Sequence, residues 1–220
     1  MNLRAGMETF FNTGIYGITA ENLSNGRDNI EVVREMLDGG IKFIQYREKE
    51  KDALSRYEEC LILRDMIKQA GGIFIIDDFI DLALAVDADG VHIGQSDLPA
   101  RTVRRILGND KIIGLSTHNS EQLEHANGLK RYIDYIGVGP IHSTSTKPNT
   151  EPVGLTYLNY SIKHSELPLV AIGGIKEQNI DEIIQAGTKT IAIVSDIVTT
   201  DNIKEKVKRL RGKIFSHMFD

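Results

Sequence analysis

Cysteine is almost absent from this sequence, in which Cys60 is the only one among 220 residues. Cys60 lies on a helical face, because Ala53, Tyr57, Leu63 and Ile67 follow the same spacing of three and four residues. This spacing predicts a buried packing residue, whereas a catalytic thiol needs an electropositive and partly exposed setting. We therefore expect a reducing compartment and predict a cytoplasmic location.

Long apolar runs and basic runs are also missing. The opening Met1–Gly6 has no continuous apolar stretch, and no later run approaches the roughly 20 residues that a membrane-spanning helix needs. We therefore expect neither export nor membrane insertion. The net charge is −5, and no basic run with interleaved aromatic residues occurs, which argues against nucleic acids and acidic membranes as partners. Any bound anion then needs a local cluster of donors.

The sequence does contain a rhythm of short apolar runs. Hydrophobic residues make up 41% of the chain and charged residues 26%, as in ordinary globular proteins, and the length suits a single domain over residues 1–220. Eight runs are too short for ordinary helices and almost continuously apolar, as expected for parallel strands covered by helices. These runs are Ile15–Ile18, Ile41–Ile44, Ile73–Ile76, Gly90–Ile93, Ile112–Leu115, Tyr135–Val138, Leu169–Ile172 and Ile191–Val194.

Amphipathic patterns fill the intervals between these runs. Three of them end at Gly39-Gly40, at Gly108 and before Gly187, where glycine accepts the left-handed conformation that ends a helix. A last predicted helix covers Ile203–Leu210. Eight strand-then-helix units without a linker predict an α/β fold, a single (β/α)8 TIM barrel. A doubly wound open sheet is the structural alternative.

A charged segment follows the second predicted strand. In Gln45–Lys49, the side chains of Gln45, Arg47 and Lys49 share one side if the chain stays extended. An amide, a guanidinium and an ammonium that converge in this way suit a diphosphate. The alternative is a solvated strand end whose cations pair with Glu48 and Glu50, and the motif alone favours that alternative.

Carboxylates follow the next two predicted strands. Asp77 and Asp78 come after the third strand, and Asp97 comes after the fourth, so all three stand at the same end of neighbouring strands. Magnesium usually takes one or two protein carboxylates and fills its other positions with water and substrate phosphates. The segment therefore predicts a magnesium (Mg²⁺) site. The alternative interprets Asp97 as a helix N-cap before Leu98-Pro99.

Later segments offer donors for a phosphate. Gly173-Gly174 follows the seventh predicted strand and Val194-Ser195 the eighth, the places where many barrels bind phosphate through backbone N–H groups. Residues 140–152 have no periodicity and are rich in Ser, Thr, Pro and Asn, which is typical of a lid or binding loop. This loop adds the hydroxyl and ammonium groups of Thr144, Thr146 and Lys147. A tight turn and an ordinary loop are the respective alternatives.

The histidines do not indicate a nucleophile. His92 lies within a predicted strand and fits a hydrogen-bonded core residue, and neither His118 nor His142 has a serine or cysteine partner that would mark a nucleophile and its base. The residues therefore favour phosphate binding over acyl transfer.

Seven segments, taken together and in order, closely resemble the thiamine phosphate synthase family, and they span nearly the whole predicted barrel. They are Gln45–Lys49, Ala88–Asp97, Gly114–His118, Gly137–Ile141, Thr144–Lys147, Ala171–Ile175 and Val194-Ser195.

The resemblance implies a transferase that joins 4-amino-2-methylpyrimidine-5-ylmethyl diphosphate to 4-methyl-5-(2-phosphooxyethyl)thiazole and releases diphosphate. Carried over by position, the residues that hold the pyrimidine diphosphate would be Gln45, Arg47, Lys49, Ser116 and Lys147, with Tyr46, Glu48 and Asp77 also at the substrate. Asp78 and Asp97 would bind magnesium. The thiazole phosphate would bind at Thr144, Ser145, Thr146, Gly174, Val194 and Ser195.

The implied chemistry agrees with these residues. The thiazole nitrogen carries a lone pair, so its attack needs no general base, and the difficult event is the departure of diphosphate. Arg47, Lys49 and Lys147 would act as the catalytic charges that stabilise the leaving group, and the loop would exclude water.

Asp77 departs from the family pattern, which usually has Asn just before the first metal aspartate. A carboxylate cannot donate a hydrogen bond as an amide does unless it is protonated. If Asp77 merely faces the diphosphate, its charge opposes binding; if it joins the metal shell, its charge strengthens magnesium binding. The sequence favours the metal shell, since an unpaired carboxylate beside a diphosphate would be costly.

Two other functions stay open at the level of sequence. A thiazole tautomerase is a paralogous barrel in which His118 would transfer protons, and the diphosphate and metal residues argue against it. The second is a non-catalytic barrel that binds thiamine phosphate, in which Asp77 in place of the usual Asn would have removed the activity. Whether the chain forms a homo-oligomer is also open.

Overall fold

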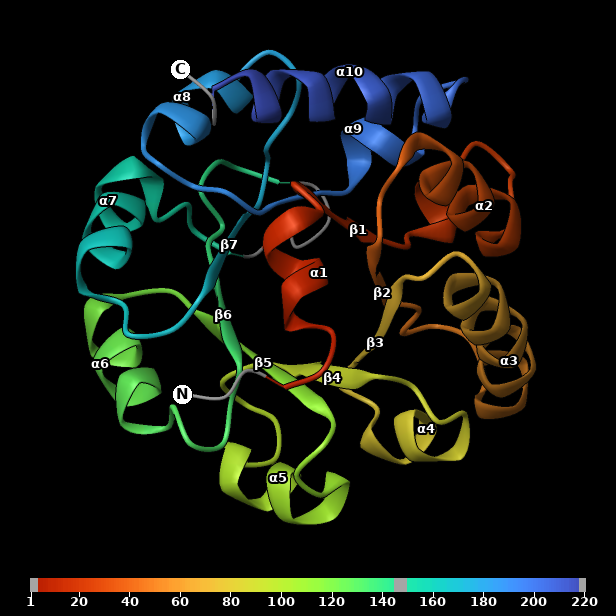
Figure 1. Cartoon of the computed structure of the whole chain (residues 1–220), viewed down its shortest axis with the longest axis horizontal. Coiled ribbons are helices and arrows are strands. Elements are labelled where there is room, and N and C mark those ends of the chain that lie inside the picture. The colour runs from red at the N-terminus through yellow and green to blue at the C-terminus, as the bar shows by residue number, and fades with distance from the viewer. Residues whose placement is uncertain (1–3, 145–149, 218–220) are drawn as a thin grey trace.

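The eight predicted strands form a closed parallel barrel. The computed structural model describes residues 4–144 and 150–217, and its strands follow one another around the barrel in chain order, with β8 pairing back to β1 (Figure 1). This closure confirms the TIM barrel and excludes the open sheet. The strands are β1 (Ile15–Ile18), β2 (Phe43–Tyr46), β3 (Ile73–Asp77), β4 (Gly90–Ile93), β5 (Ile112–Thr117), β6 (Tyr135–Val138), β7 (Leu169–Ile172) and β8 (Ile191–Ile193).

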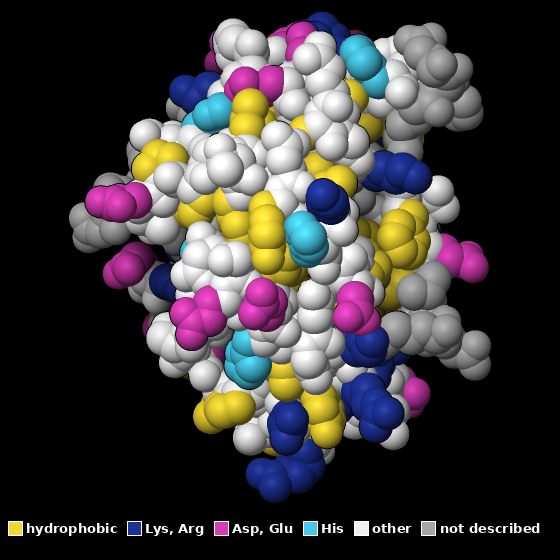
Figure 2. Space-filling model, turned by 90° about the vertical axis from the view of Figure 1, so that its left-hand side faces the viewer, with side chains coloured by type: hydrophobic (Ala, Val, Ile, Leu, Met, Phe, Trp, Pro, Cys, Tyr) yellow, Lys and Arg dark blue, Asp and Glu magenta, His cyan; other side chains and the backbone are white. Residues whose placement is uncertain are grey.

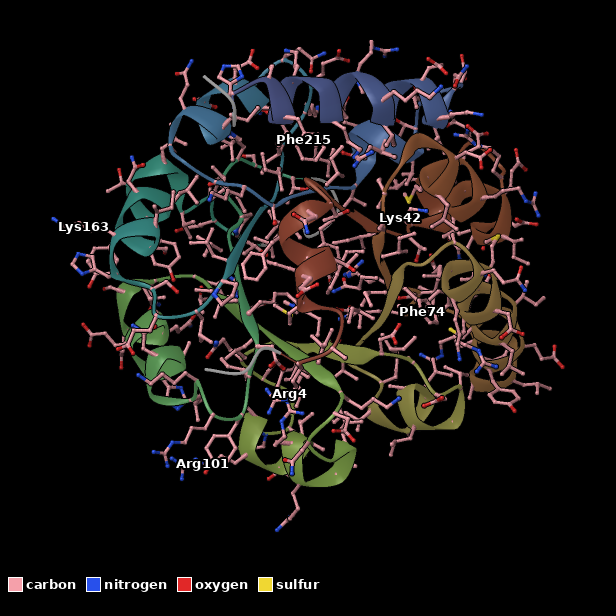
Figure 3. All side chains as sticks on the ribbon, viewed as in Figure 1. Arg4, Lys42, Phe74, Arg101, Lys163 and Phe215 are labelled. Atoms are coloured by element: carbon pink, nitrogen blue, oxygen red, sulfur yellow. The ribbon has the colours of Figure 1, made fainter. Side chains whose placement is uncertain are left out.

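Helices surround the barrel, and charged side chains such as Arg101 on α5 and Lys163 on α7 point away from it (Figures 1 and 3). The outer helices are α2 (Asn29–Gly39), α3 (Ala53–Gln69), α4 (Ile80–Ala85), α5 (Ala100–Leu107), α6 (Ser120–Gly128), α7 (Gly154–His164), α8 (Ile180–Gln185) and α10 (Ile203–Ser216). A short 3-10 turn, η1 (Glu21–Leu23), follows β1, and α9 (Ser195–Val198) follows β8. Within the described residues, none of the helices has the length and apolarity needed to cross a membrane.

The second strand begins two residues later than the sequence predicts. Ile41 is buried, but its N–H bonds to the carbonyl of Met36, and the N–H of Gly40 bonds to Leu37. Gly40 has a φ of 103°, so this segment is the left-handed end of α2. The apolar side chain of Ile41 thus belongs to a helix end, and β2 extends instead to Gln45 and Tyr46.

A short helix that the sequence pattern did not reveal, α1 (Met7–Asn12), covers the opening at the amino-terminal ends of the strands (Figure 1). Its Met7 and Phe10 side chains are fully buried. The Phe10 ring meets those of Phe43 and Tyr135, whose centroids lie 5.3 and 4.9 Å away. This end of the barrel is therefore closed by apolar side chains, which leaves the opposite end for a site.

Most of the apolar side chains pack in a second layer between the strands and the outer helices. Cys60 lies in this layer with 0% exposure, which confirms its predicted packing role, and burial raises the pKa of its thiol. On the face that carries α6, α7 and α8, acidic and basic side chains are interspersed with uncharged ones (Figure 2).

The polar centre of the barrel depends on a glycine. A Cβ atom on Gly114 would lie 2.2 Å from Cζ of Tyr135 and 2.5 Å from Nδ1 of His92, both too close for real atoms. By contrast, a Cβ atom on Gly212, within α10, would meet nothing within 4 Å.

We expect Gly114→Ala to lower the free energy of unfolding by about 1–3 kcal/mol, because overpacked side chains must shift. Gly212→Ala should raise it by up to about 1 kcal/mol, because alanine favours a helix interior. Denaturant unfolding of both variants measures these changes. Equal stability of the Gly114→Ala variant and the parent chain would contradict the close packing.

Candidate active site

A cavity of about 1060 Å³, including its part open to solvent, lies at the carboxyl ends of the strands. This is large enough for a small organic substrate. It adjoins a cleft over β3 to β5, and Asp77, His92, Ser116 and His118 line both. The predicted site residues that line the cavity are Gln45, Arg47, Asp77, Ser116, Thr144, Gly174, Val194 and Ser195, and those in the cleft include Lys49, Asp78 and Asp97. Ser145, Thr146 and Lys147 lie outside the described residues.

The two cations that follow β2 face two carboxylates at the carboxyl end of β3, one on its last residue, Asp77, and one on the next, Asp78. Nε of Arg47 lies 3.3 Å from Oδ2 of Asp77, and Nζ of Lys49 lies 2.6 Å from Oδ2 of Asp78 and 3.9 Å from Asp77. The structure thus brings Arg47 and Lys49 to one side, as alternation predicts. Among the described residues their ion pairs are with Asp77 and Asp78, so the alternative pairing with Glu48 and Glu50 is wrong.

Asp77 is a nearly buried carboxylate with a compensating charge. Its side chain is 10% exposed and contacts Arg47, so the premise of an unpaired carboxylate is wrong. The Arg47 backbone N–H bonds to Oγ1 of Thr19, 2.8 Å away, which fixes the start of the segment that carries the guanidinium. Asp77 therefore competes with any anion for Arg47.

Asp78 and Asp97 offer hard oxygen ligands at the cleft. Asp78 has a φ of 62°, a conformation that is uncommon for a residue with a side chain and that often marks a functional site. Oδ2 of Asp97 accepts the N–H of Gly94 at 2.6 Å. The helix α5 starts at Ala100 with Pro99 at its N-cap, so the alternative role of Asp97 as a helix cap is wrong.

Two carboxylates, Asp78 and Asp97, are the candidate magnesium ligands of the cleft. In residues 4–144 and 150–217, no three His, Cys, Asp or Glu side chains gather closely enough to hold a metal on their own. Magnesium commonly accepts one or two carboxylates and takes its remaining ligands from water and substrate phosphates. Asp78 and Asp97 suit that coordination.

Tyr46 and Glu48 do not line the cavity, because they alternate to the other side of the segment. The Tyr46 hydroxyl donates to Oε2 of Glu59 at 2.6 Å, and Oε1 of Glu48 accepts the N–H of Glu21 at 3.0 Å. Burial raises the pKa of the Glu48 carboxyl. Both side chains therefore anchor the segment that presents Arg47. The same alternation that places Gln45 and Arg47 on one side of the segment places Tyr46 and Glu48 on the other.

A chain of hydrogen bonds crosses the barrel beneath the cavity. The Gln45 amide donates to the Tyr16 hydroxyl at 3.0 Å, and this hydroxyl lies 2.8 Å from that of Tyr135. The Tyr135 hydroxyl lies 3.0 Å from Nδ1 of His92, whose Nε2 lies 2.9 Å from Oγ of Ser116. His92 is thus the hydrogen-bonded residue that its strand position predicts. This series of hydrogen bonds orients both Gln45 and Ser116.

Sequence reasoning missed Tyr16 and Tyr135, the two tyrosines of this hydrogen-bond series. Both lie at inward positions of predicted strands, so strand alternation was the signal that could have found them. Burial raises the pKa of both hydroxyls, which keeps Tyr16 and Tyr135 protonated.

The two glycines after β7 are required by a neighbouring loop. A Cβ atom on Gly173 would lie 2.4 Å from Cα of Pro140, and one on Gly174 would lie 2.5 Å from the carbonyl oxygen of Ser143. The His142 N–H also bonds to the Gly173 carbonyl at 3.0 Å. The pair therefore combines a turn with close packing against the loop after β6, and it borders the cavity beside Val194 and Ser195.

His118 also reaches the cavity. Its Nδ1 lies 2.6 Å from the Gly139 carbonyl oxygen, which can only accept, so Nδ1 carries the proton. The side chain of His142 instead lies 3.0 Å from Glu182, and it does not line the cavity.

Comparisons with known proteins agree with this geometry. Residues 15–197 match the family described as "Thiamine monophosphate synthase". The chain is 54% identical to a thiamine-phosphate synthase of Pelotomaculum thermopropionicum over 96% of both chains, and 48% identical to one of Caldicellulosiruptor saccharolyticus over 93% of this chain and 92% of that one. The solved thiamine phosphate pyrophosphorylase of Pyrococcus furiosus superposes with a TM-score of 0.86 at 31% identity, covering 96% of this chain and 99% of its own.

Proposed function

The chain belongs to the thiamine monophosphate synthase family, and from that premise we propose how its barrel carries out the reaction. It is an enzyme, a transferase with thiamine-phosphate synthase activity. The substrates in the proposal are 4-amino-2-methylpyrimidine-5-ylmethyl diphosphate and 4-methyl-5-(2-phosphooxyethyl)thiazole. The observation that carries the proposal is one cavity bordered by Arg47 and by the Gly174 and Ser195 loops, so that donors for two anions share one space.

The pyrimidine diphosphate would bind on the side of β2 to β5. Its diphosphate takes Arg47 and Lys49 as partners, with a guanidinium that can form two parallel hydrogen bonds and an ammonium that acts as a point charge. The side chains of Gln45 and Ser116 would contact the pyrimidine, because the hydrogen-bonded chain through Tyr16, Tyr135 and His92 holds both of them. Lys147 is carried over from the family as a third cation.

The thiazole phosphate would bind on the side of β7 and β8. Gly174, Val194 and Ser195 border this part of the cavity, and Thr144 lines it as well. Their backbone N–H groups would be the donors to the phosphate. Ser145 and Thr146 join the same proposal by their position in the family. The thiazole ring then lies between the two anion subsites, which points its nitrogen toward the pyrimidine methylene.

The reaction forms one bond and breaks one. The lone pair of the thiazole nitrogen forms the new C–N bond to the methylene carbon, and the methylene C–O bond breaks, with its electron pair leaving on diphosphate. No proton has to move, so no general base is required. The demand is for stabilisation of the departing charge, which Arg47 and Lys49 would supply as neighbouring cations. Lys147 joins them by its position in the family.

Asp78 and Asp97 are the residues that we propose to hold Mg²⁺. When bound, magnesium neutralises charge on the diphosphate and assists its departure. Lys49 contacts Asp78 at 2.6 Å, so metal and substrate binding would transfer the ammonium from this carboxylate to the diphosphate.

The two alternatives lack comparable support. Proton transfer by His118 would serve a tautomerase, but the relatives compared above are synthases by name and the cations of β2 are in place. Asp77 is paired with Arg47, which gives no reason to regard the site as inactive.

Because the two subsites share the rim of one barrel, we also propose that residues 1–220 act as one domain. Both substrates are phosphorylated and do not cross membranes freely, which supports a cytoplasmic place of action.

We expect the purified chain to convert the two substrates into thiamine phosphate and equimolar diphosphate when magnesium is present. Chromatography of the products measures both. Isomerisation of a carboxythiazole without any coupling would instead support a tautomerase, and binding of thiamine phosphate without turnover would support a non-catalytic barrel.

Arg47→Ala should lower turnover by on the order of a hundredfold or more, the effect of removing one preorganised electrostatic donor. Ser195→Ala should be milder, because the proposed contacts there are largely through backbone N–H groups. Arg34→Ala, an exposed arginine on α2, is the matched control and should leave turnover unchanged. Steady-state kinetics of the folded variants measures these changes. Unchanged turnover in Arg47→Ala would refute the role of Arg47.

Asp77→Asn tests what the departure from the family does. Because Asp77 contacts Arg47, removing its charge should free the guanidinium and lower the KM for the pyrimidine diphosphate severalfold. The magnesium concentration at half-maximal activity should stay unchanged, whereas Asp78→Asn should raise it. A raised magnesium midpoint in Asp77→Asn would assign Asp77 to the metal shell instead.

A further inference from the structure

Lys206 is a buried lysine that the proposed chemistry does not use. It lies on α10, its side chain is only 10% exposed, and lysine is almost never so buried unless it is paired. Its Nζ lies 2.8 Å from Oε2 of Glu177 and 2.9 Å from Oδ2 of Asp196. One ammonium thus joins two carboxylates from different parts of the chain.

The two carboxylates stand directly behind the loops of the proposed phosphate subsite. Glu177 comes three residues after Gly174, and Asp196 comes immediately after Ser195. Oδ2 of Asp196 also accepts the backbone N–H of Glu177 at 2.8 Å. The loop after β7 and the loop after β8 are therefore joined to each other, and Lys206 ties both to α10.

The far end of the second loop is fixed from another side. Nη2 of Arg27 donates to the carbonyl oxygens of Val198 and Thr200 at 2.7 and 2.8 Å. The short helix α9 is thus held at its carboxyl end by Arg27 and at its amino end by Asp196. Little of the loop after β8 is left free to adjust when a phosphate arrives.

From these contacts we infer that Lys206 is a positioning residue for the phosphate subsite, an inference that rests on the proposed function. It holds the Gly174 and Ser195 loops at a fixed separation, and it neutralises Asp196, whose charge would otherwise repel a phosphate at the neighbouring Ser195. Two other cations among the described residues reach this cluster only at Glu177. Nε of Arg209, whose side chain is 57% exposed, lies 3.5 Å from its carboxylate, and Nζ of Lys213 lies 3.3 Å from its backbone carbonyl oxygen.

The test separates the two substrates. Lys206→Met keeps much of the apolar side chain and removes the charge. The KM for the thiazole phosphate should therefore rise on the order of tenfold or more, the scale seen when a residue that orients the ligands of a metal site is removed. The KM for the pyrimidine diphosphate should stay unchanged, because its proposed partners follow β2 to β5. A general folding defect would lower the active fraction and leave both KM values unchanged.

Two further variants sharpen the result. Lys208→Met removes an exposed lysine of the same helix that pairs with Glu205, and it should change neither KM. Adding Asp196→Asn to Lys206→Met should recover most of the lost affinity, because the asparagine removes the repelling charge but keeps an oxygen for the Glu177 N–H.

Calorimetric binding of the thiazole phosphate to the parent chain and to each variant gives a measure that does not depend on turnover. Absence of product from the parent chain would reject the proposed function, and this binding measurement would still test Lys206. Equal affinities of the parent chain and Lys206→Met, or an equal rise in both KM values, would overturn the positioning role.

Discussion

Closure of the barrel is the constraint on which the rest of the structure depends. Because all eight strands are parallel and β8 pairs with β1, every strand ends at the same rim. Residues that are far apart in the chain, such as Arg47 and Ser195, therefore border one cavity. Closure also leaves two open ends, and the apolar side chains of α1 cover the one opposite the cavity.

The barrel centre adds a second requirement, because polar groups removed from water must find hydrogen-bond partners. Tyr16, Tyr135 and His92 satisfy one another there and extend the chain to Gln45 and Ser116. The groups that face the cavity are thus held by a network whose two tyrosines are buried. Gly114 makes the space for it, which links the packing of the fold to the orientation of the site.

Much of this arrangement could be predicted from the sequence, because strand and helix periods are local. The strand positions followed from short apolar runs, and alternation placed Arg47 and Lys49 on one side. Ile41 misled the prediction because an apolar residue can end a helix as well as begin a strand. The helix α1 is too short for a clear period. The role of Lys206 depends on Glu177 and Asp196, partners that only the folded chain brings near, so no local pattern reveals it.

The two proposed anion subsites differ in a way that suits the fates of the ligands that we propose for them. Lys49 is 42% exposed, and it has a carboxylate partner in Asp78 to which it can return. Cations of this kind can follow a diphosphate as it leaves and then recover their resting pairs. The phosphate of the thiazole stays attached to the product, and its loops are held by the buried Lys206 and by Arg27. The charges at the leaving diphosphate would thus be mobile, whereas the loops at the retained phosphate would be fixed. Only one side of the site would then rearrange while the bond between the substrates forms.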